Sequence, residues 1–225
     1  MTPRRLSALG TKLDPGKTPE TGSGFTGYSL VAMSSRLPAA ERREQLLSVA
    51  LSVFSEKGFH GASMNDVAEA AGVTKPVLYQ HFESKRELYM ALLDEAGERL
   101  LLLIVASASE ATSPHDQVSR GVRAYFRWVA EHRESFLLLF GDGGRRDEEF
   151  TEAVRLLEAR MATAIAPMIR AEIDHEHQTT LAHGIIGLAE STSRRLVQSG
   201  KPFDPDIVAH QIGEMLWAGL RAVHR

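Results

Sequence analysis

The chain has 225 residues, of which 43% are hydrophobic and 24% are charged, a composition typical of globular proteins with enough apolar material for a core. It contains no cysteine, which excludes disulfides, thiolate metal sites and a catalytic thiol, and is typical of proteins of the reducing cytoplasm. The longest charge-free apolar stretch, residues 100–109, is far shorter than the roughly 20 residues that a membrane span needs. We therefore expect a soluble, cytoplasmic protein of one or two domains with no membrane partner.

The formal net charge of −3 excludes a protein that coats nucleic acid by bulk charge. The charge is unevenly distributed, because residues 1–90 carry a balance of +2 and residues 91–225 a balance of −5. Any contact with a polyanion is therefore expected from the N-terminal part, through individually placed residues.

Residues 1–37 differ from the rest of the chain in composition, with three Pro, five Gly and ten Ser or Thr. They hold too few large apolar residues to offset the entropy of ordering, which predicts a disordered tail. Two interpretations remain open. Either the tail has no role, with Met33 as the true start, or it is a basic arm that lies along DNA. Under the second interpretation Arg36, next to the folded part, is a DNA-contacting residue.

From Pro38 onward, apolar residues recur at helical spacing, and no period-two alternation or hairpin signal appears. Capping residues, glycines and prolines set the boundaries of the predicted helices. We expect helices at 38–58, 63–72, 74–82, from Ser84 onward, at 113–132, from about Asp147 to a break at Pro167, at 179–199 and from Asp204 to the C-terminus, with a loop at 141–144. The sequence therefore predicts an all-α fold.

Residues 63–82, S-M-N-D-V-A-E-A-A-G-V-T-K-P-V-L-Y-Q-H-F, contain two short predicted helices joined by a glycine turn. Ser63 and Asp66 make a start that resembles a capping box, and Gly72 supplies the left-handed backbone that the turn requires. Pro76 lies in the first turn of the second helix, where a missing N–H costs nothing. This spacing is typical of a helix-turn-helix, whose second helix enters the DNA major groove.

The side chains of this motif fall into two chemical groups. Donors to phosphate set the register on DNA without reading its sequence, and we expect this role of Ser63, Thr74, Tyr79, His81 and Lys85. Lys75 can donate hydrogen bonds to guanine edges, and Gln80 can donate to adenine. Pro76 and Val77 suit thymine methyl groups. The alternative is a solvated helix face that makes no DNA contact.

Residues 38–90, and especially G-V-T-K-P-V-L-Y-Q-H-F-x-S-K-x-E-L-Y, resemble the DNA-binding domain of the TetR/AcrR family of bacterial regulators. Tyr79, the His81-Phe82 pair and Lys85 fall where that family's motif has them. The resemblance implies an all-helical homodimer of about nine helices per chain. It also implies a helix-turn-helix DNA-binding domain at 38–90 and a ligand-binding and dimerisation domain at 91–225.

A second resemblance is to actinobacterial regulators of fatty-acid synthesis that respond to long-chain acyl-CoA. It rests on R-L-P-A-A-E-R-R-E-Q-L-L at the start of the folded part, on K-P-V-L-Y-Q-H-F, and on K-P-F with L-W-A-G-L near the C-terminus. It implies a long apolar effector such as an acyl-CoA.

The middle helices hold many apolar and aromatic residues, which form either a helical core or, as the family resemblance implies, part of a ligand cavity between helices. Few polar residues lie among them, so the implied effector is large and apolar. The predicted lining residues are Leu100, Leu103, Ile104, Phe126, Val129, Phe136, Phe140, Leu157, Met161 and Ile165. Arg120, Arg123 and Arg127 share one helix face and form either a solvated charged face or a site for an anionic head group.

The last two predicted helices have features of a dimer interface. They carry two apolar stripes and several small residues that allow close helix approach. The stripes are Leu181, Ile185, Leu188 and Thr192, and Val208, Ile212, Met215, Leu216, Gly219 and Val223; the small residues are Gly184, Gly187, Gly213, Ala218 and Gly219. A symmetric dimer matches a palindromic operator.

Enzyme motifs are absent from the sequence, so we predict no catalytic residue and no cofactor. His175, His177 and His183 suggest a metal site, but His175 and His183 are two helical turns apart, which favours surface histidines and no metal.

The predicted function is that of a ligand-responsive regulator, a repressor or a lipid-responsive switch, on palindromic double-stranded DNA. Two alternatives remain. A multidrug-efflux repressor for aromatic or cationic compounds predicts acidic residues in the cavity, for which Glu98 and Glu158 are the candidates. A helical interaction module without DNA binding predicts no salt-dependent DNA affinity.

Overall fold

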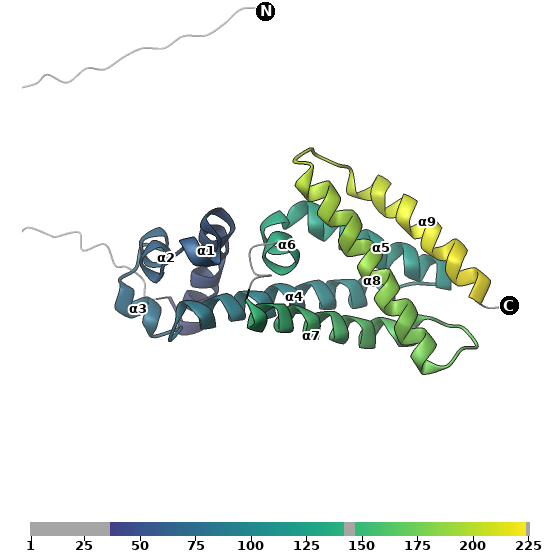
Figure 1. Ribbon diagram of the computed structural model, residues 1–225, viewed down its shortest axis with the longest axis horizontal. Coiled ribbons are helices and arrows are strands. Elements are labelled where there is room, and N and C mark those ends of the chain that lie inside the picture. Colours follow the sequence, from purple (N-terminus) through teal and green to yellow (C-terminus); the bar gives the residue numbers. More distant parts are fainter. Residues whose placement is uncertain (1–36, 142–146, 224–225) are drawn as a thin grey trace, which may run out of the picture. The chain divides into compact units, whose positions relative to one another are not determined.

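The computed structural model describes residues 37–141 and 147–223. These residues form nine α-helices and one short 3₁₀ helix, with no strand among them (Figure 1). The prediction of an all-α fold with about nine helices is confirmed. The structure does not describe residues 1–36, which include Arg36 and nearly all of the predicted tail. It also does not describe most of the predicted loop at 141–144.

The N-terminal part consists of three helices and the start of a fourth: α1 (Ala39–Gly61), α2 (Met64–Ala70), α3 (Lys75–Tyr79) and α4 (Lys85–Ser109). Gly58, where the sequence predicts the end of the first helix, has a φ of 69° and interrupts α1, which then continues to Gly61. The third helix is shorter than expected, because it ends at Tyr79 and the chain passes through a turn at residues 80–81 before α4 begins.

Local capping starts two of these helices. Ser63 caps α2 with a complete capping box, since its hydroxyl accepts from the Asp66 N–H and the Asp66 carboxylate accepts from the Ser63 N–H. Ser84 caps α4 by accepting from the Glu87 N–H. This is not a complete capping box, because the Glu87 carboxylate accepts from the N–H of Glu83 instead of Ser84.

The C-terminal part adds five helices and the 3₁₀ turn: α5 (Pro114–Glu131), α6 (Arg133–Phe140), α7 (Glu148–Ile165), η1 (Ala166–Met168), α8 (His175–Gln198) and α9 (Pro205–Val223). Pro167 lies in η1, just after α7 ends, as predicted. α8 begins four residues earlier than predicted, because Asp174 caps it by accepting from the His177 N–H. α6 follows α5 directly and has no counterpart among the predicted helices, which end at 132 and resume at about Asp147.

Helix α4 lies at the centre of this arrangement and contacts α1, α5, α6 and α7 (Figure 1). α9 packs chiefly on α5, and α8 chiefly on α7. Residues 37–225 form one compact unit, so the predicted parts at 38–90 and 91–225 are continuous through α4, and their boundary stays a prediction. None of the described helices is long and apolar enough to cross a membrane.

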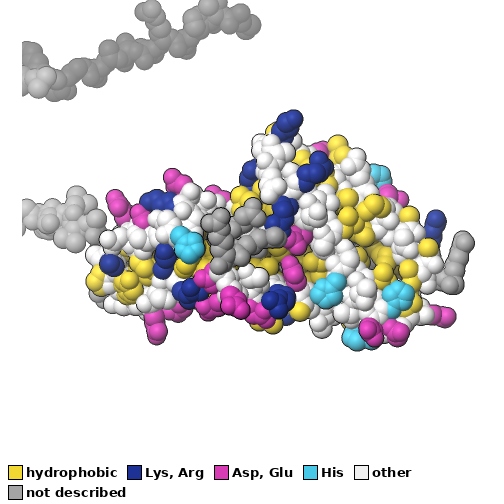
Figure 2. Space-filling view, viewed as in Figure 1, with side chains coloured by type: hydrophobic (Ala, Val, Ile, Leu, Met, Phe, Trp, Pro, Cys, Tyr) yellow, Lys and Arg dark blue, Asp and Glu magenta, His cyan; other side chains and the backbone are white. Residues whose placement is uncertain are grey.

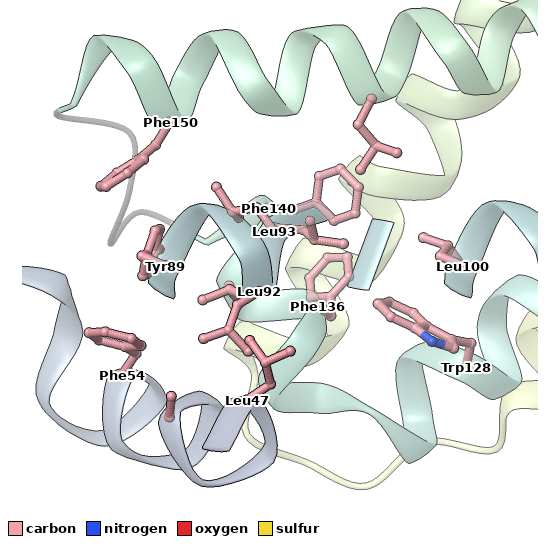
Figure 3. Packing of buried hydrophobic residues seen from close by; sticks show 14 of the residues in the cluster. Leu47, Phe54, Tyr89, Leu92, Leu93, Leu100, Trp128, Phe136, Phe140 and Phe150 are labelled. Carbon is pink, nitrogen blue, oxygen red and sulfur yellow. The ribbon is translucent and has the colours of Figure 1, made fainter. Parts of the chain in front are cut away.

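An aromatic cluster connects the N-terminal part with α7 (Figure 3). The Tyr89 ring on α4 lies 5.2 Å from Phe54 of α1 and 4.5 Å from Phe150 of α7, measured between ring centroids. Beside the cluster, the Arg86 guanidinium donates to the Asp147 and Glu149 carboxylates at the start of α7. The position of α7 is therefore connected through these contacts to the positions of α1 and α4.

Candidate DNA interface and effector cavity

The turn between α2 and α3 has the geometry of a helix-turn-helix. Gly72 has a φ of 64°, a left-handed conformation that side chains other than glycine rarely adopt. Its N–H donates to the Glu69 carbonyl, and the Val73 N–H donates to the Ala68 carbonyl. Val67 and Leu78 are fully buried between the two helices, so apolar packing sets the angle at which α3 leaves the turn.

This packing leaves one exposed face on and beside α3, which we call the recognition face: Thr74, Lys75, Pro76, Tyr79 and Gln80. Tyr79 has 42% of its surface exposed. The Lys75 ammonium lies 5.9 Å from the centroid of the Tyr79 ring. Val77 and His81 are half-buried at the edge of this face.

Two predicted phosphate donors also make hydrogen bonds within the protein. The Lys85 ammonium donates to the carbonyls of Phe59 and Ala62, at 2.7 and 2.8 Å, and lies over the Phe59 ring. It satisfies carbonyls where α1 ends and so joins α4 to α1, while one of its three N–H groups is not used by these two bonds, and its phosphate contact stays a prediction. The Ser63 hydroxyl is likewise engaged, since it donates to the Asp66 carboxylate that caps α2.

An apolar cavity of about 120 Å³ lies between α4, α5, α7, α8 and α9. Its walls include Ile104 and Ala108 of α4, Val118 and Val122 of α5, and Ile186 of α8. Gly121 of α5 also faces it, and a Cβ atom there would have only ordinary contacts, 3.8 Å to Ala108 and 3.9 Å to Ile104. The cavity therefore has room at its α5 wall.

The predicted lining residues divide into three groups. Ile104, Phe140, Met161 and Ile165 line the cavity. Leu100, Phe126, Val129 and Phe136 are fully buried in the core and do not line it. Leu157 packs against Gly97 beside a groove between α4 and α7, and Leu103 is 39% exposed beside Arg120 on the outer surface, because Leu100 and Ile104 occupy the inward positions of that helical turn.

Other lining residues have no signal in the sequence. Ile185, Ile212 and Leu216, which the sequence assigns to a dimer interface, line the cavity because α9 packs on α5. Tyr125 and Glu190 also line it. Glu190 is bonded to Arg194 one turn further along α8, so its charge is balanced within the protein.

The three arginines of α5 are ion-paired. Arg127 donates twice to Asp206 of α9, at 2.8 Å, Arg123 lies 3.9 Å from the same carboxylate, and Arg120 pairs with Asp116 at 2.9 Å. The pair with Arg127 lowers the pKa of Asp206. This face therefore connects α5 to α9, and it lies outside the apolar cavity.

Exposed apolar side chains lie over α8 and α9 (Figure 2). Ile207 and Met215 of α9 are 57% and 52% exposed. Cβ atoms built at Gly184 and Gly187 of α8 and at Gly219 of α9 would meet nothing within 4 Å. This surface, which we call the α8–α9 surface, has the open space that close helix approach needs.

The three histidines near the start of α8 are exposed. Among the described residues, no group of three or more His, Asp or Glu side chains is arranged to hold a metal ion.

Two family models match the chain. Residues 46–92 match the model described as bacterial regulatory proteins, tetR family, and residues 114–219 match the model described as tetracyclin repressor-like, C-terminal domain. Together these matches cover more than half of the chain. The first ends within α4, and the second begins with α5.

The chain is similar to curated relatives from Mycolicibacterium smegmatis. It is 29% identical to the HTH-type transcriptional activator FasR over 191 residues, which cover 84% of this chain and 87% of FasR. It is also 29% identical to the HTH-type transcriptional repressor KstR2 over 107 residues, 48% of this chain and 52% of KstR2.

Solved structures share the fold. A TetR-like transcriptional regulator from Rhodococcus sp. RHA1 matches with a TM-score of 0.69 and 28% identity over 83% of this chain and 99% of its own. The regulator FadR from Bacillus subtilis, solved in complex with stearoyl-CoA, matches with a TM-score of 0.68 and 15% identity over 77% of this chain and 96% of its own. At 15% identity, the similarity to FadR shows a shared fold only.

Proposed function

Since the chain belongs to the tetR family of bacterial regulatory proteins, it is a DNA-binding transcriptional regulator and not an enzyme, and we propose that a long apolar effector such as an acyl-CoA controls its affinity for a palindromic operator. The effector enters the cavity between α4, α5, α7, α8 and α9. The recognition face enters the major groove, with Lys75, Pro76, Val77 and Gln80 at base edges and Thr74, Tyr79 and His81 at phosphates.

The main observation behind this proposal is that α4 runs from the DNA-binding part to the cavity. It begins at Lys85, directly after the recognition helix, and residues of its far end, Ile104 and Ala108, form one wall of the cavity. A displacement at that wall therefore moves the end of the helix that supports α3.

The size of the cavity explains why occupancy would have an effect. A volume of about 120 Å³ is below the roughly 300–1,000 Å³ of typical ligand pockets. A long chain fits only if the helices around it move apart, so the effector binds the expanded arrangement better than the closed one. An effector shifts a conformational equilibrium by this difference in affinity.

The chemistry of the lining supports an apolar effector over a cationic one. Of the acidic candidates for an efflux regulator, Glu98 is exposed on α4, and Glu158 lines a second pocket, of about 300 Å³, between α4, α6 and α7. Glu190, the acidic residue in the cavity wall, is paired with Arg194. A cationic compound would have to compete with that arginine.

Members of this family act as dimers, and the α8–α9 surface is the proposed interface. Its exposed Ile207 and Met215 and its open glycines are suited to a four-helix arrangement of α8 and α9 from two chains. Such a dimer presents its two recognition faces to half-sites about one helical turn, or a multiple of it, apart.

The test uses the full chain and operator DNA selected from a random library. Adding stearoyl-CoA should change the operator affinity measured by fluorescence anisotropy, and the direction of the change in a reporter assay tells activation from repression. The variant Gly121→Leu, which places a side chain in the cavity, should bind the operator normally but lose the response. A response that is equal in Gly121→Leu and in the unaltered protein would contradict the proposed effector site.

A further inference from the structure

Two hydroxyl groups beside the cavity lack hydrogen-bond partners. The Tyr125 hydroxyl on α5 and the Ser193 hydroxyl on α8 are both buried, and neither has a partner of good geometry among the described residues. Ser193 is fully buried and Tyr125 is 6% exposed. Buried polar side-chain atoms are nearly always hydrogen-bonded, so two buried hydroxyls with no better partner than each other have hydrogen-bonding capacity left for a ligand.

The position of these hydroxyls relates them to the effector site. Tyr125 lines the cavity, and its hydroxyl has Ser193, Glu190 and Arg194 as neighbours. Glu190 lines the same cavity, so the tyrosine hydroxyl lies where α5 and α8 both meet the cavity wall.

This place is the inner end of the cavity. Among its lining residues, Pro114 and Arg170 are exposed to solvent, whereas Tyr125, Phe140 and Ile186 are buried. Pro114 and Tyr125 are separated by about 16 Å along α5, at 1.5 Å per residue. An elongated molecule that enters near Pro114 therefore reaches the hydroxyls with its innermost part.

The charges around the Tyr125 hydroxyl define what it can bind. Burial raises the pKa of Tyr125 well above its ordinary value, and the Glu190 carboxylate raises it further, so the phenol is neutral and donates a hydrogen bond at neutral pH. The same carboxylate repels an anionic group, and Arg194 repels a cationic one. A neutral oxygen atom is the complementary partner.

We infer that the effector carries an uncharged oxygen, a hydroxyl or a carbonyl, on the part of its apolar skeleton that lies innermost, and that this oxygen hydrogen-bonds to Tyr125 beside Ser193. The inference rests on the proposed function in placing the effector in this cavity. It ranks effectors that carry such an oxygen above plain-chain ones such as stearoyl-CoA, because a plain chain offers the two hydroxyls no partner beyond each other.

The test uses pairs of small probes of matched shape, which do not depend on whether an acyl-CoA is the effector. Phenol and toluene differ in a hydroxyl against a methyl group, and acetophenone and isopropylbenzene differ in a carbonyl oxygen against a methyl group. An engineered apolar cavity of similar size binds benzene. Dissociation constants for each probe are measured by NMR titration of the full chain and of the variants Tyr125→Phe, Ser193→Ala and Ser135→Ala.

We expect the ratio of phenol to toluene affinity to fall roughly five- to tenfold in Tyr125→Phe, the value of one hydrogen bond. Ser193→Ala should lower the ratio less. Ser135→Ala removes a buried serine hydroxyl on α6, outside the cavity, and should leave the ratio unchanged. A parallel fall for acetophenone against isopropylbenzene assigns the site to carbonyls as well, and a fall for phenol alone assigns it to hydroxyls.

An unchanged ratio in Tyr125→Phe would overturn the inference, and so would the failure of all four probes to bind the unaltered protein. Thermal unfolding gives a second criterion. Tyr125→Phe should be at least as stable as the unaltered protein because it removes an unpaired buried hydroxyl, whereas a clear loss of stability would indicate a purely structural tyrosine. If the probes behave as expected and stearoyl-CoA has no effect on the operator, the cavity assignment stands and the acyl-CoA proposal fails.

Discussion

The helix-turn-helix and the effector cavity are held together by interactions of different range. Around α2 and α3, the controlling contacts join residues close in sequence, such as the Ser63 capping box and the Val73 to Ala68 bond. Around the cavity, Tyr125 lies beside Ser193 and α9 covers α5, so residues far apart in the chain build the site. The first region is therefore set by contacts within a short stretch of the chain, and the second by the way distant helices pack.

The largest expected effect tests the packing under the recognition face. Leu78→Ala removes a fully buried side chain between α2 and α3 and should lower the free energy of unfolding by about 2–5 kcal/mol, together with operator binding. Leu156→Ala makes the same change at a residue that is 57% exposed and serves as the control in denaturant unfolding. Equal losses in the two variants would mean that α3 is not positioned by this packing.

Two lysines of the N-terminal part separate stability from DNA binding. Lys85→Met breaks the bonds to the carbonyls at the end of α1 and should lower the free energy of unfolding by about 1–3 kcal/mol without changing the salt dependence of operator binding. Lys75→Met should leave stability unchanged and weaken binding by about 1–3 kcal/mol, mainly at operators with the guanine it contacts. A loss of operator binding in Lys85→Met without a loss of stability would support a phosphate contact of Lys85.

Tyr79→Phe tests the division of the recognition face into phosphate and base contacts. Loss of one hydrogen bond to phosphate should weaken binding to all operators alike by about 1 kcal/mol. Gln80→Ala is the comparison, because it should weaken binding at one base position only. Binding constants on a panel of single-base operator variants give the answer, and a sequence-dependent loss in Tyr79→Phe would make the phosphate assignment wrong.

The smallest effect on stability is expected from Arg86→Ala, since the pair with Asp147 is partly exposed to solvent. Its consequence should be a weaker response of operator binding to the effector, because Arg86 joins α4 to the start of α7. Arg155→Ala, which breaks an exposed pair with Glu152 within α7, is the control. An unreduced response in Arg86→Ala would exclude this connection from the signal.

The same pair predicts a pH dependence. The Arg86 hydrogen bond holds the pKa of Asp147 below its ordinary value of 3.8, so the pair contributes above pH 3.8 and is lost as the pH falls through the lowered pKa. We therefore expect no contribution of Asp147 to pH dependence between about pH 5 and 8, and unfolding experiments below pH 4 should show a larger loss of stability on its protonation in the unaltered protein than in Arg86→Ala.

The sequence by itself determined the helices and the motif, since their signals are local. Capping residues, Gly72 and Pro167 act within a few positions of the backbone that they shape, which is why the all-α fold and the recognition face follow from the residues alone. Even here the sequence did not show that Lys85 donates to two carbonyls at the end of α1, because no local signal marks those carbonyls.

Only the tertiary structure decided which apolar residues line the cavity. Phe136 and Phe140 are equally apolar, yet Phe140 lines the cavity and Phe136 lies in the core. Tyr125 and Ser193 become a pair only because α5 and α8 meet beside the cavity. Hydrophobic periodicity shows which face of a helix is buried, but it does not show which other helix covers that face, and that choice created the cavity with its polar inner end.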